Sequence, residues 1–153
     1  MSTTNNAGAK ISVTLTGPAG GRVTSLADAE GLTYTESLVG QEVPVTGYDS
    51  SSQENVNLLE NISVFGDTKK PKEVTVKFEN DDADPVVTLL DSVVHISNQP
   101  VFVKVTLPTV NGTVRETYFG GILTGNTNSS GDVSSAQFVE YMVKPYYLYK
   151  KVV

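Results

Sequence analysis

The sequence predicts a mainly β domain: a β-sandwich or partly closed barrel of two packed antiparallel sheets, flanked by one short α-helix. Apolar and polar residues alternate in several short segments, most clearly at 101–107, and this period of two is typical of strands with one buried face. The period changes to that of a helix once, at 84–95. With 153 residues and no cysteine, the chain is expected to bury one core without disulfides.

The N-terminal elements follow from local pattern and turn chemistry. Residues 1–9 are polar and lack apolar periodicity, so we expect a flexible arm before a single domain at 10–153. Residues 11–15 alternate and predict a strand, and the glycines and proline at the start of 17–25 predict a tight turn that returns the chain. Residues 32–37, rich in Thr and Tyr, predict a further strand.

The middle of the chain is predicted to hold a long loop and two strands. Residues 39–53 contain two glycines, a proline and three consecutive serines, with little apolar content. We expect a long exposed loop or hairpin tip there, of the kind that a partner orders. A strand pattern resumes at 56–64, a basic connection follows at 66–72, and 73–79 alternates again.

One short α-helix is predicted at about 84–95. Asp84 is placed to cap its N-terminus and Pro85 occupies the first turn, where proline is favoured. An apolar stripe with helical spacing follows, made of Val86, Leu89, Leu90, Val93 and Val94. Its β-branched residues weaken a helix by a few tenths of a kcal/mol each, so burial of the stripe against a sheet is expected to stabilise it.

The C-terminal part is predicted to be entirely β. Residues 101–107 and 113–119 form a hairpin pattern around a loop that contains Asn-Gly. The glycines at 120–121 predict a bulge or bend. Strands are expected at 136–144 and in the Tyr-rich C-terminal segment.

Charge and composition disfavour several classes of function. The net charge is −6, and residues 23–67 hold eight acids and no Lys or Arg. Such a surface repels a phosphate backbone, which disfavours ordinary DNA or RNA binding. This acidic segment is interpreted either as an ordinary solvated surface or as a surface that lets DNA pass without binding it. No apolar run is long enough for a membrane span and the N-terminus lacks signal-peptide features, so a soluble protein without a membrane partner is expected.

No catalytic, cofactor-binding or metal-binding pattern is recognised. His95, the single histidine, has no serine or carboxylate pair placed by spacing to work with it. Asp81, Asp82 and Asp84 lack the glycine and glutamate of a calcium loop. The glycines of 17–21 precede no Lys-Ser/Thr pair of a phosphate loop. We therefore expect no enzyme activity, no cofactor and no metal.

The order of these features resembles the tail tube proteins of long-tailed bacteriophages. The resemblance covers residues 10–151 and rests on pattern and spacing. The segments that carry it are 11–15, 31–36, 48–50, 74–78, Asp84-Pro85 with the helix that follows, 103–108, 111–112 and 118–121.

The resemblance implies hexameric rings that stack into a hollow tube, through which DNA passes during ejection. It implies a virion tail protein, assembled in the bacterial cytoplasm, whose partners are further copies of itself and other tail proteins, such as a terminator, a baseplate or tip, and a tape measure protein. The candidate channel-lining acids are Glu36, Glu54 and Glu140. The candidate contacts between subunits or rings are Val43, Pro44, Val45, Tyr48, Asp49, Lys69, Lys70, Lys72, Tyr147 and Tyr149.

Two alternatives remain open at this point. A tail terminator or head-tail connector ring protein would share the same kind of fold. A non-enzymatic binding module, either a capsid decoration protein or a carbohydrate-binding β-sandwich, would use the tyrosines at 141, 146, 147 and 149 as a recognition face. For these tyrosines we favour cross-strand packing or a subunit contact.

Overall fold

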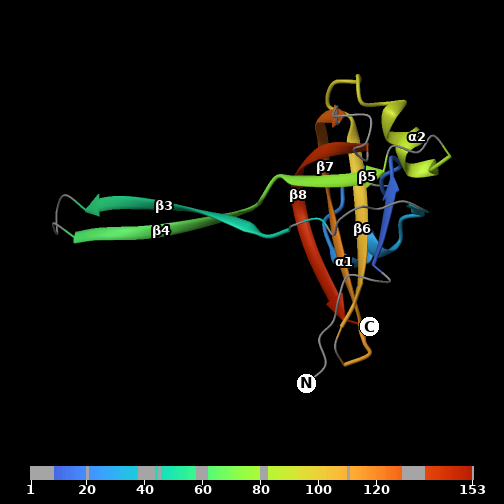
Figure 1. Cartoon of the computed structure of the whole chain (residues 1–153). Helices are drawn as coiled ribbons and strands as arrows, with labels where there is room; N and C mark the ends of the chain where they lie inside the picture. Colours follow the sequence, from blue (N-terminus) through green and yellow to red (C-terminus); the bar gives the residue numbers. More distant parts are fainter. Residues whose placement is uncertain are drawn as a thin grey trace.

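The computed structural model describes residues 9–19, 21–37, 44, 46–57, 62–79, 83–109, 111–128 and 137–152 (Figure 1). The predicted mainly β class is confirmed. The elements are β1 (Lys10–Thr14), α1 (Leu26–Glu30), β2 (Thr35–Glu36), β3 (Tyr48–Asn57), β4 (Ile62–Pro71), β5 (Val74–Glu79), α2 (Pro85–Asp91), β6 (Pro100–Pro108), β7 (Val114–Asn128) and β8 (Phe138–Val152).

Six strands form one curled antiparallel sheet, a half-barrel with the order β2-β1-β6-β7-β8-β5. Its centre is the pair of long strands β7 and β8, whose register shifts at Gly120/Gly121 and at Leu123/Gly125. The bulge expected at the two glycines is therefore confirmed. Bulges increase local twist and bend a strand, which fits the curl of the sheet around its inner face (Figure 1).

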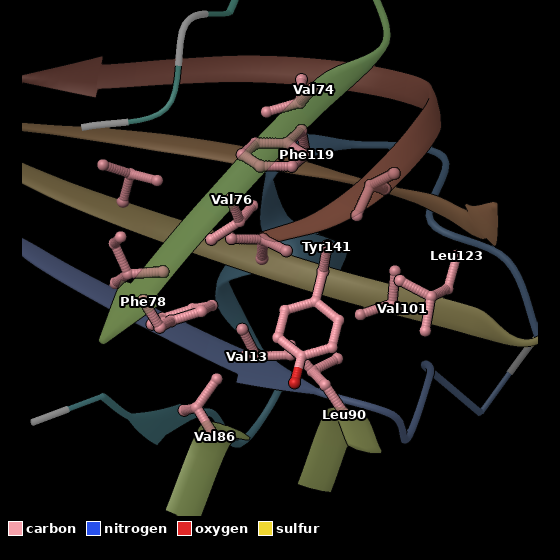
Figure 2. Close-up of a cluster of buried hydrophobic side chains, with 14 of the residues drawn as sticks. Val13, Val74, Val76, Phe78, Val86, Leu90, Val101, Phe119, Leu123 and Tyr141 are labelled. Carbon is pink, nitrogen blue, oxygen red and sulfur yellow. The ribbon is translucent and has the colours of Figure 1, made fainter. Parts of the chain in front are cut away.

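The inner face of the sheet carries the main hydrophobic core, and α2 covers it. Figure 2 shows Val86 and Leu90 of α2 directed at the side chains of the strands. The buried members of this core are Ile11, Val13, Val74, Val76, Phe78, Val86, Val87, Leu90, Val101, Val103, Val105, Phe119, Leu123, Val139, Tyr141, Val143 and Leu148. The alternating apolar residues of the strands and the apolar stripe of the helix thus pack into one core. This agrees with the two periods, because every second residue of a strand and every third or fourth residue of a helix lie on one face.

The helix α2 is shorter than the predicted 84–95. It starts after Asp84, whose carboxylate accepts a hydrogen bond from Val86 N at 2.9 Å, and it ends with Ser92 as its C-cap. Val93 and Val94 pack, partly buried, against the core from the turn that follows. Val93 and Val94 are apolar because they are partly buried against the sheet, and residues in a turn can be buried in this way as well as residues in a helix. The apolar pattern therefore predicted a longer helix than the structure has.

A second helix, α1, contradicts the prediction of a single helix and lies at 26–30, between the predicted turn at 17–25 and the predicted strand at 32–37, where no element was predicted. Ser25 caps it, accepting a hydrogen bond from Asp28 N through its side chain. It covers the outer face of the sheet, opposite to α2, where a second cluster of buried residues contains Val23, Ala29, Phe102, Tyr118 and Tyr147. Five residues are too few for a periodic stripe, although the Ser-x-x-Asp pattern is a helix-start signal.

The hairpin of β3 and β4 forms the second sheet and extends away from the first (Figure 1). Of the loop or hairpin expected at 39–53, residues 48–53 belong to the first strand of this ribbon, whereas residues 39–43 and 45 lie outside the described part of the chain. The predicted strand 56–64 is divided between β3 and β4, and the predicted connection 66–72 is mostly β4. Ten backbone pairs join the two strands. The ribbon extends away from the sheet that holds the core (Figure 1), and its serine-rich first strand lacks alternation.

Candidate functional site

The described residues contain no group of three or more His, Cys, Asp or Glu that could hold a metal ion. No described helix is both long and apolar enough to cross a membrane. His95 is exposed just beyond α2. The candidate functional site consists of the surfaces that the fold offers to other chains, namely the sheet edges, the hairpin base and the outer face of the sheet.

The two edges of the six-stranded sheet are the first such surface. In the described part of the chain, β2 and β5 each have a hydrogen-bonded neighbour on one side only. At one edge β2 covers β1 only opposite Ser12 and Val13. At the other edge β5 pairs with β8 through six residues and has an exposed or half-buried side chain at every second position. Such edges are templates for pairing with another chain.

The base of the β3–β4 hairpin gathers several of the predicted contact residues. Tyr48 is half exposed, and its hydroxyl donates a hydrogen bond of 2.8 Å to Leu148 O of β8, which ties the ribbon to the sheet. Asp49 lies opposite Lys70 in the register and forms an exposed ion pair with Lys72 at 3.9 Å. Lys69 and Lys70 are exposed beside them. Charged groups of both signs thus stand where the ribbon leaves the sheet.

Two of the three predicted channel acids share one face of the sheet. Glu36 of β2 lies opposite Ser12 and forms an ion pair of 3.5 Å with Lys10, in which both side chains are about half exposed. Glu140 of β8 lies opposite Lys77, and its neighbours in β8 are buried in the inner core. Alternation places both acids on the outer face, near opposite edges of the sheet. Glu54 lies in β3 and is not brought to them.

The other predicted contact residues fall in different environments. Pro44 is buried, whereas Val43 and Val45 lie outside the described residues. Tyr149 is half-buried beside the second cluster. Tyr147 is only 4% exposed, so its ring packs inside the chain and not on its surface.

The second cluster holds most of the tyrosines that a recognition face would need. Ring centroids lie 5.4 Å apart for Tyr147 and Tyr149, and 4.9 Å apart for Tyr146 and Tyr147. The guanidinium of Arg22 lies 4.3 Å from the centroid of Tyr146. Burial raises the pKa of the Tyr147 hydroxyl above its ordinary range, and this hydroxyl has no hydrogen-bond partner among the described residues. The arrangement favours packing as the role of the cluster.

No family model matches the chain, and no curated protein matches its sequence. Among solved structures, the chain is similar to one from the cryo-EM structure of the anti-feeding prophage (AFP) baseplate, 6-fold symmetrised. The TM-score is 0.55 at 11% sequence identity, and the match covers 99% of this chain and 97% of that chain. At this identity the likeness concerns the fold, which extends over the full length of both chains.

Proposed function

We propose that this chain is a structural, non-enzymatic protein of a phage tail-type particle, and that it assembles into rings that form a tail tube. The observation that carries the proposal is the full-length fold likeness to a chain of the 6-fold symmetrised baseplate of the anti-feeding prophage. Two features of the chain's own surface support it independently: the edge strands β2 and β5, each with a strand neighbour on one side only in the described residues, and the hairpin that projects from the sheet.

The edge strands offer a way to close a ring. Pairing β5 of one copy with the β2 and β1 edge of the next would continue the antiparallel sheet from copy to copy. The contact joins two different edges, so it is heterologous, and a heterologous contact gives a ring when its rotation closes. Six copies are the number implied by the resemblance to tail tube proteins.

The hairpin offers a way to reach a neighbouring copy. Its strands have ten residues each, which corresponds to a ribbon about 30 Å long. An isolated two-stranded hairpin is marginally stable in water, so contact with a second copy or a second ring would stabilise it. In this arrangement Lys69, Lys70 and Lys72 meet acids of the adjacent copy.

The outer face of the sheet is our candidate for the channel wall. Glu36 and Glu140 lie on that face, and a ring would repeat each of them once in every copy. Repeated acids would keep a DNA backbone in motion through repulsion. A lysine lies next to each acid and offsets part of its charge: Lys10 forms an ion pair with Glu36, and Lys77 lies opposite Glu140.

A single ring within a baseplate is the second candidate function, because the similar solved chain comes from a baseplate. The two functions differ in whether rings stack. A baseplate ring forms specific contacts with other tail proteins, whereas a tube ring repeats its contact with copies of itself.

The test is negative-stain electron microscopy of the purified protein over a range of concentrations, together with its mass in solution. Hollow tubes support the tube. Single rings with six times the chain mass of 16.3 kDa support the baseplate role and contradict the tube. A monomer at every concentration contradicts both.

A shortened hairpin makes the test specific to the ribbon. Ser52 pairs with Asp67 in the register, so residues 53–66 can be replaced by Asn-Gly, which closes a two-residue hairpin without shifting the pairing. We expect a folded chain, with the circular dichroism and melting temperature of the sheet retained, that no longer forms tubes. Tubes of normal length from this variant would show that the ribbon has no part in stacking.

A further inference from the structure

The segment between β1 and β2 differs from the rest of the fold in how it is held. Residues 21–34, which we call the strap, contain α1 and lie over the outer face of the sheet. The strap contributes only two fully buried side chains, Val23 and Ala29. The strands and α2 share the much larger inner core on the opposite face. Leu26, Leu32 and Tyr34 of the strap pack, partly buried, against the same cluster. The strap is therefore attached to the sheet by fewer fully buried side chains than the inner core contains.

Hydrogen bonds within the strap make it a unit of its own. The carboxylate of Asp28 accepts from Thr24 N at 3.1 Å and from Thr24 Oγ1 at 2.9 Å, and the Ser25 hydroxyl accepts from Asp28 N at 3.3 Å. The hydroxyl of Tyr34 donates to Ala29 O at 2.7 Å. These bonds join both ends of the strap to α1 without using the sheet, so the strap can keep its shape when it moves.

Few polar contacts join the strap to the sheet. Among the described residues, its one hydrogen bond to a strand is Val23 N to the Tyr146 hydroxyl, at 2.9 Å. Its one ion pair to a strand is Glu30 with Lys151, at 3.1 Å, and both side chains are about one-third or more exposed. A partly exposed pair contributes little to stability. The stacking of Arg22 on Tyr146 adds to these contacts.

Two further observations favour opening over rigid closure. An open pocket of about 450 Å³ lies between the end of β1 with the residues that follow it and the C-terminal part of the strap, and its lining includes Thr14, Thr16, Gly17, Gly31, Leu32 and Thr33. Close packing does not hold the strap there. In addition, the hydroxyl of Tyr147 is buried in the strap's cluster without a partner in the described structure, and an unpaired buried hydroxyl gains hydrogen bonds when water reaches it.

We propose that the strap is a conformational device that opens as a unit while the six-stranded sheet stays folded. In the closed state the outer face is covered by α1, and in the open state it presents the aromatic surface of Phe102, Tyr118 and Tyr147. Local opening of this kind occurs in segments with few buried contacts. The inference concerns the single chain and does not rest on ring formation.

Amide hydrogen exchange of the full chain, resolved by residue, tests the proposal. The reporter is the amide of Val23, which is 2% exposed and bonded to Tyr146 across the strap boundary. The reference is Phe119 in β7, which is 0% exposed. We expect Val23 to exchange at least about tenfold faster than Phe119, with a rate that low denaturant barely changes, because local opening exposes little surface. Equal rates with equal denaturant dependence would overturn the proposal.

A pair of matched variants separates opening of the strap from general destabilisation. Lys151→Ala removes the ion pair between strap and sheet and should speed exchange of Val23 about two- to fivefold while Phe119 is unchanged. Lys10→Ala removes a similarly exposed ion pair, with Glu36, outside the strap and should leave Val23 unchanged. If Lys151→Ala speeds Phe119 as much as Val23, the strap and the sheet open together and the proposal is wrong.

Discussion

The hydroxyl of Ser37 donates a hydrogen bond of 2.7 Å to Oδ2 of Asp84, whose Oδ1 accepts from Val86 N at 2.9 Å. Asp84 is fully buried. One carboxylate thus caps α2 and fixes the chain directly after β2 against that helix. This contact joins the edge of the sheet to the helix that covers its inner core.

Replacing Asp84 tests this double role. Asp84→Ala should lower the free energy of unfolding by about 0.5–2 kcal/mol for the lost cap and by about 1 kcal/mol more for the bond to Ser37. Asp84→Asn keeps an acceptor for Val86 N and should lose less. Ser37→Ala keeps the cap and should lose less than Asp84→Ala. Urea denaturation measures all three, and an unchanged midpoint for Asp84→Ala would contradict the assignment.

A close approach of backbone and side chain at Gly120 gives a second prediction. A Cβ at this position would lie 2.7 Å from the Tyr147 hydroxyl oxygen and 2.9 Å from Val101 O. Gly120→Ala should therefore reduce stability by about 1–3 kcal/mol through overpacking. Gly125→Ala is the control, because its Cβ would meet only the flexible end of Met142, at 3.3 Å. The expectation fails if both variants unfold at the same denaturant concentration.

The parts of the fold that the sequence predicts well are those that bury one face. Strand β6 and strand β5 alternate because every second residue enters the inner core, and α2 shows its stripe and cap for the same reason. The hairpin of β3 and β4 extends away from the six-stranded sheet (Figure 1), and α1 is shorter than two turns. Apolar periodicity arises from burial of one face of an element. Elements that are short or project from the core are therefore not predicted from it.

The candidate surfaces were harder to predict than the elements. Glu36 and Glu140 share a face only because β2 and β8 belong to the same sheet, and strand order is a long-range property that local pattern does not contain. The two register shifts between β7 and β8 add to this, since each one changes which residues are opposite. Tyr147 is buried in a cluster that also contains Ala29 of α1, a helix that the periodicity of the sequence does not reveal.

Two buried tyrosines should respond differently to removal of the hydroxyl. Tyr141 donates a hydrogen bond to the Asp91 carboxylate, and Tyr141→Phe should cost about 1.5–3 kcal/mol, the range for hydrogen bonds to charged groups. Tyr147 has no partner in the described structure, and Tyr147→Phe should leave stability unchanged or raise it. Thermal and denaturant unfolding of the two variants measures the contrast, and equal losses would contradict it.

Asp28 should make the strap sensitive to acid. The Thr24 amide, which donates to its carboxylate, lowers the pKa of Asp28 below the ordinary value of 3.8. Because the pKa is lower in the folded strap, ionised Asp28 stabilises the folded strap at pH values above the ordinary pKa of 3.8. This stabilisation is lost as the pH falls through the pKa of the folded state. Exchange of the Thr24 amide, which donates to this carboxylate, should therefore speed up, after correction for its intrinsic rate, as the pH falls below 3.8, because the bonds inside the strap weaken. Val23 should respond less, because opening of the strap as a unit keeps those bonds. Asp28→Asn should flatten that response, and the same slope in both proteins would exclude Asp28 as its source.

Charge reversal at the base of the hairpin tests whether that surface meets another copy. Lys70 and Lys72 are exposed and not part of the core, so the double change Lys70→Glu and Lys72→Glu should leave the melting temperature of the single chain nearly unchanged. If acids of an adjacent copy face these lysines, the variant should assemble only at higher protein concentration. The difference from the unaltered chain should shrink as salt screens the charges, over a Debye length of about 10 Å at 0.1 M. Lys150→Glu, an exposed change near the end of β8, serves as the control, and an equal effect there would indicate general repulsion and not a contact at the hairpin base.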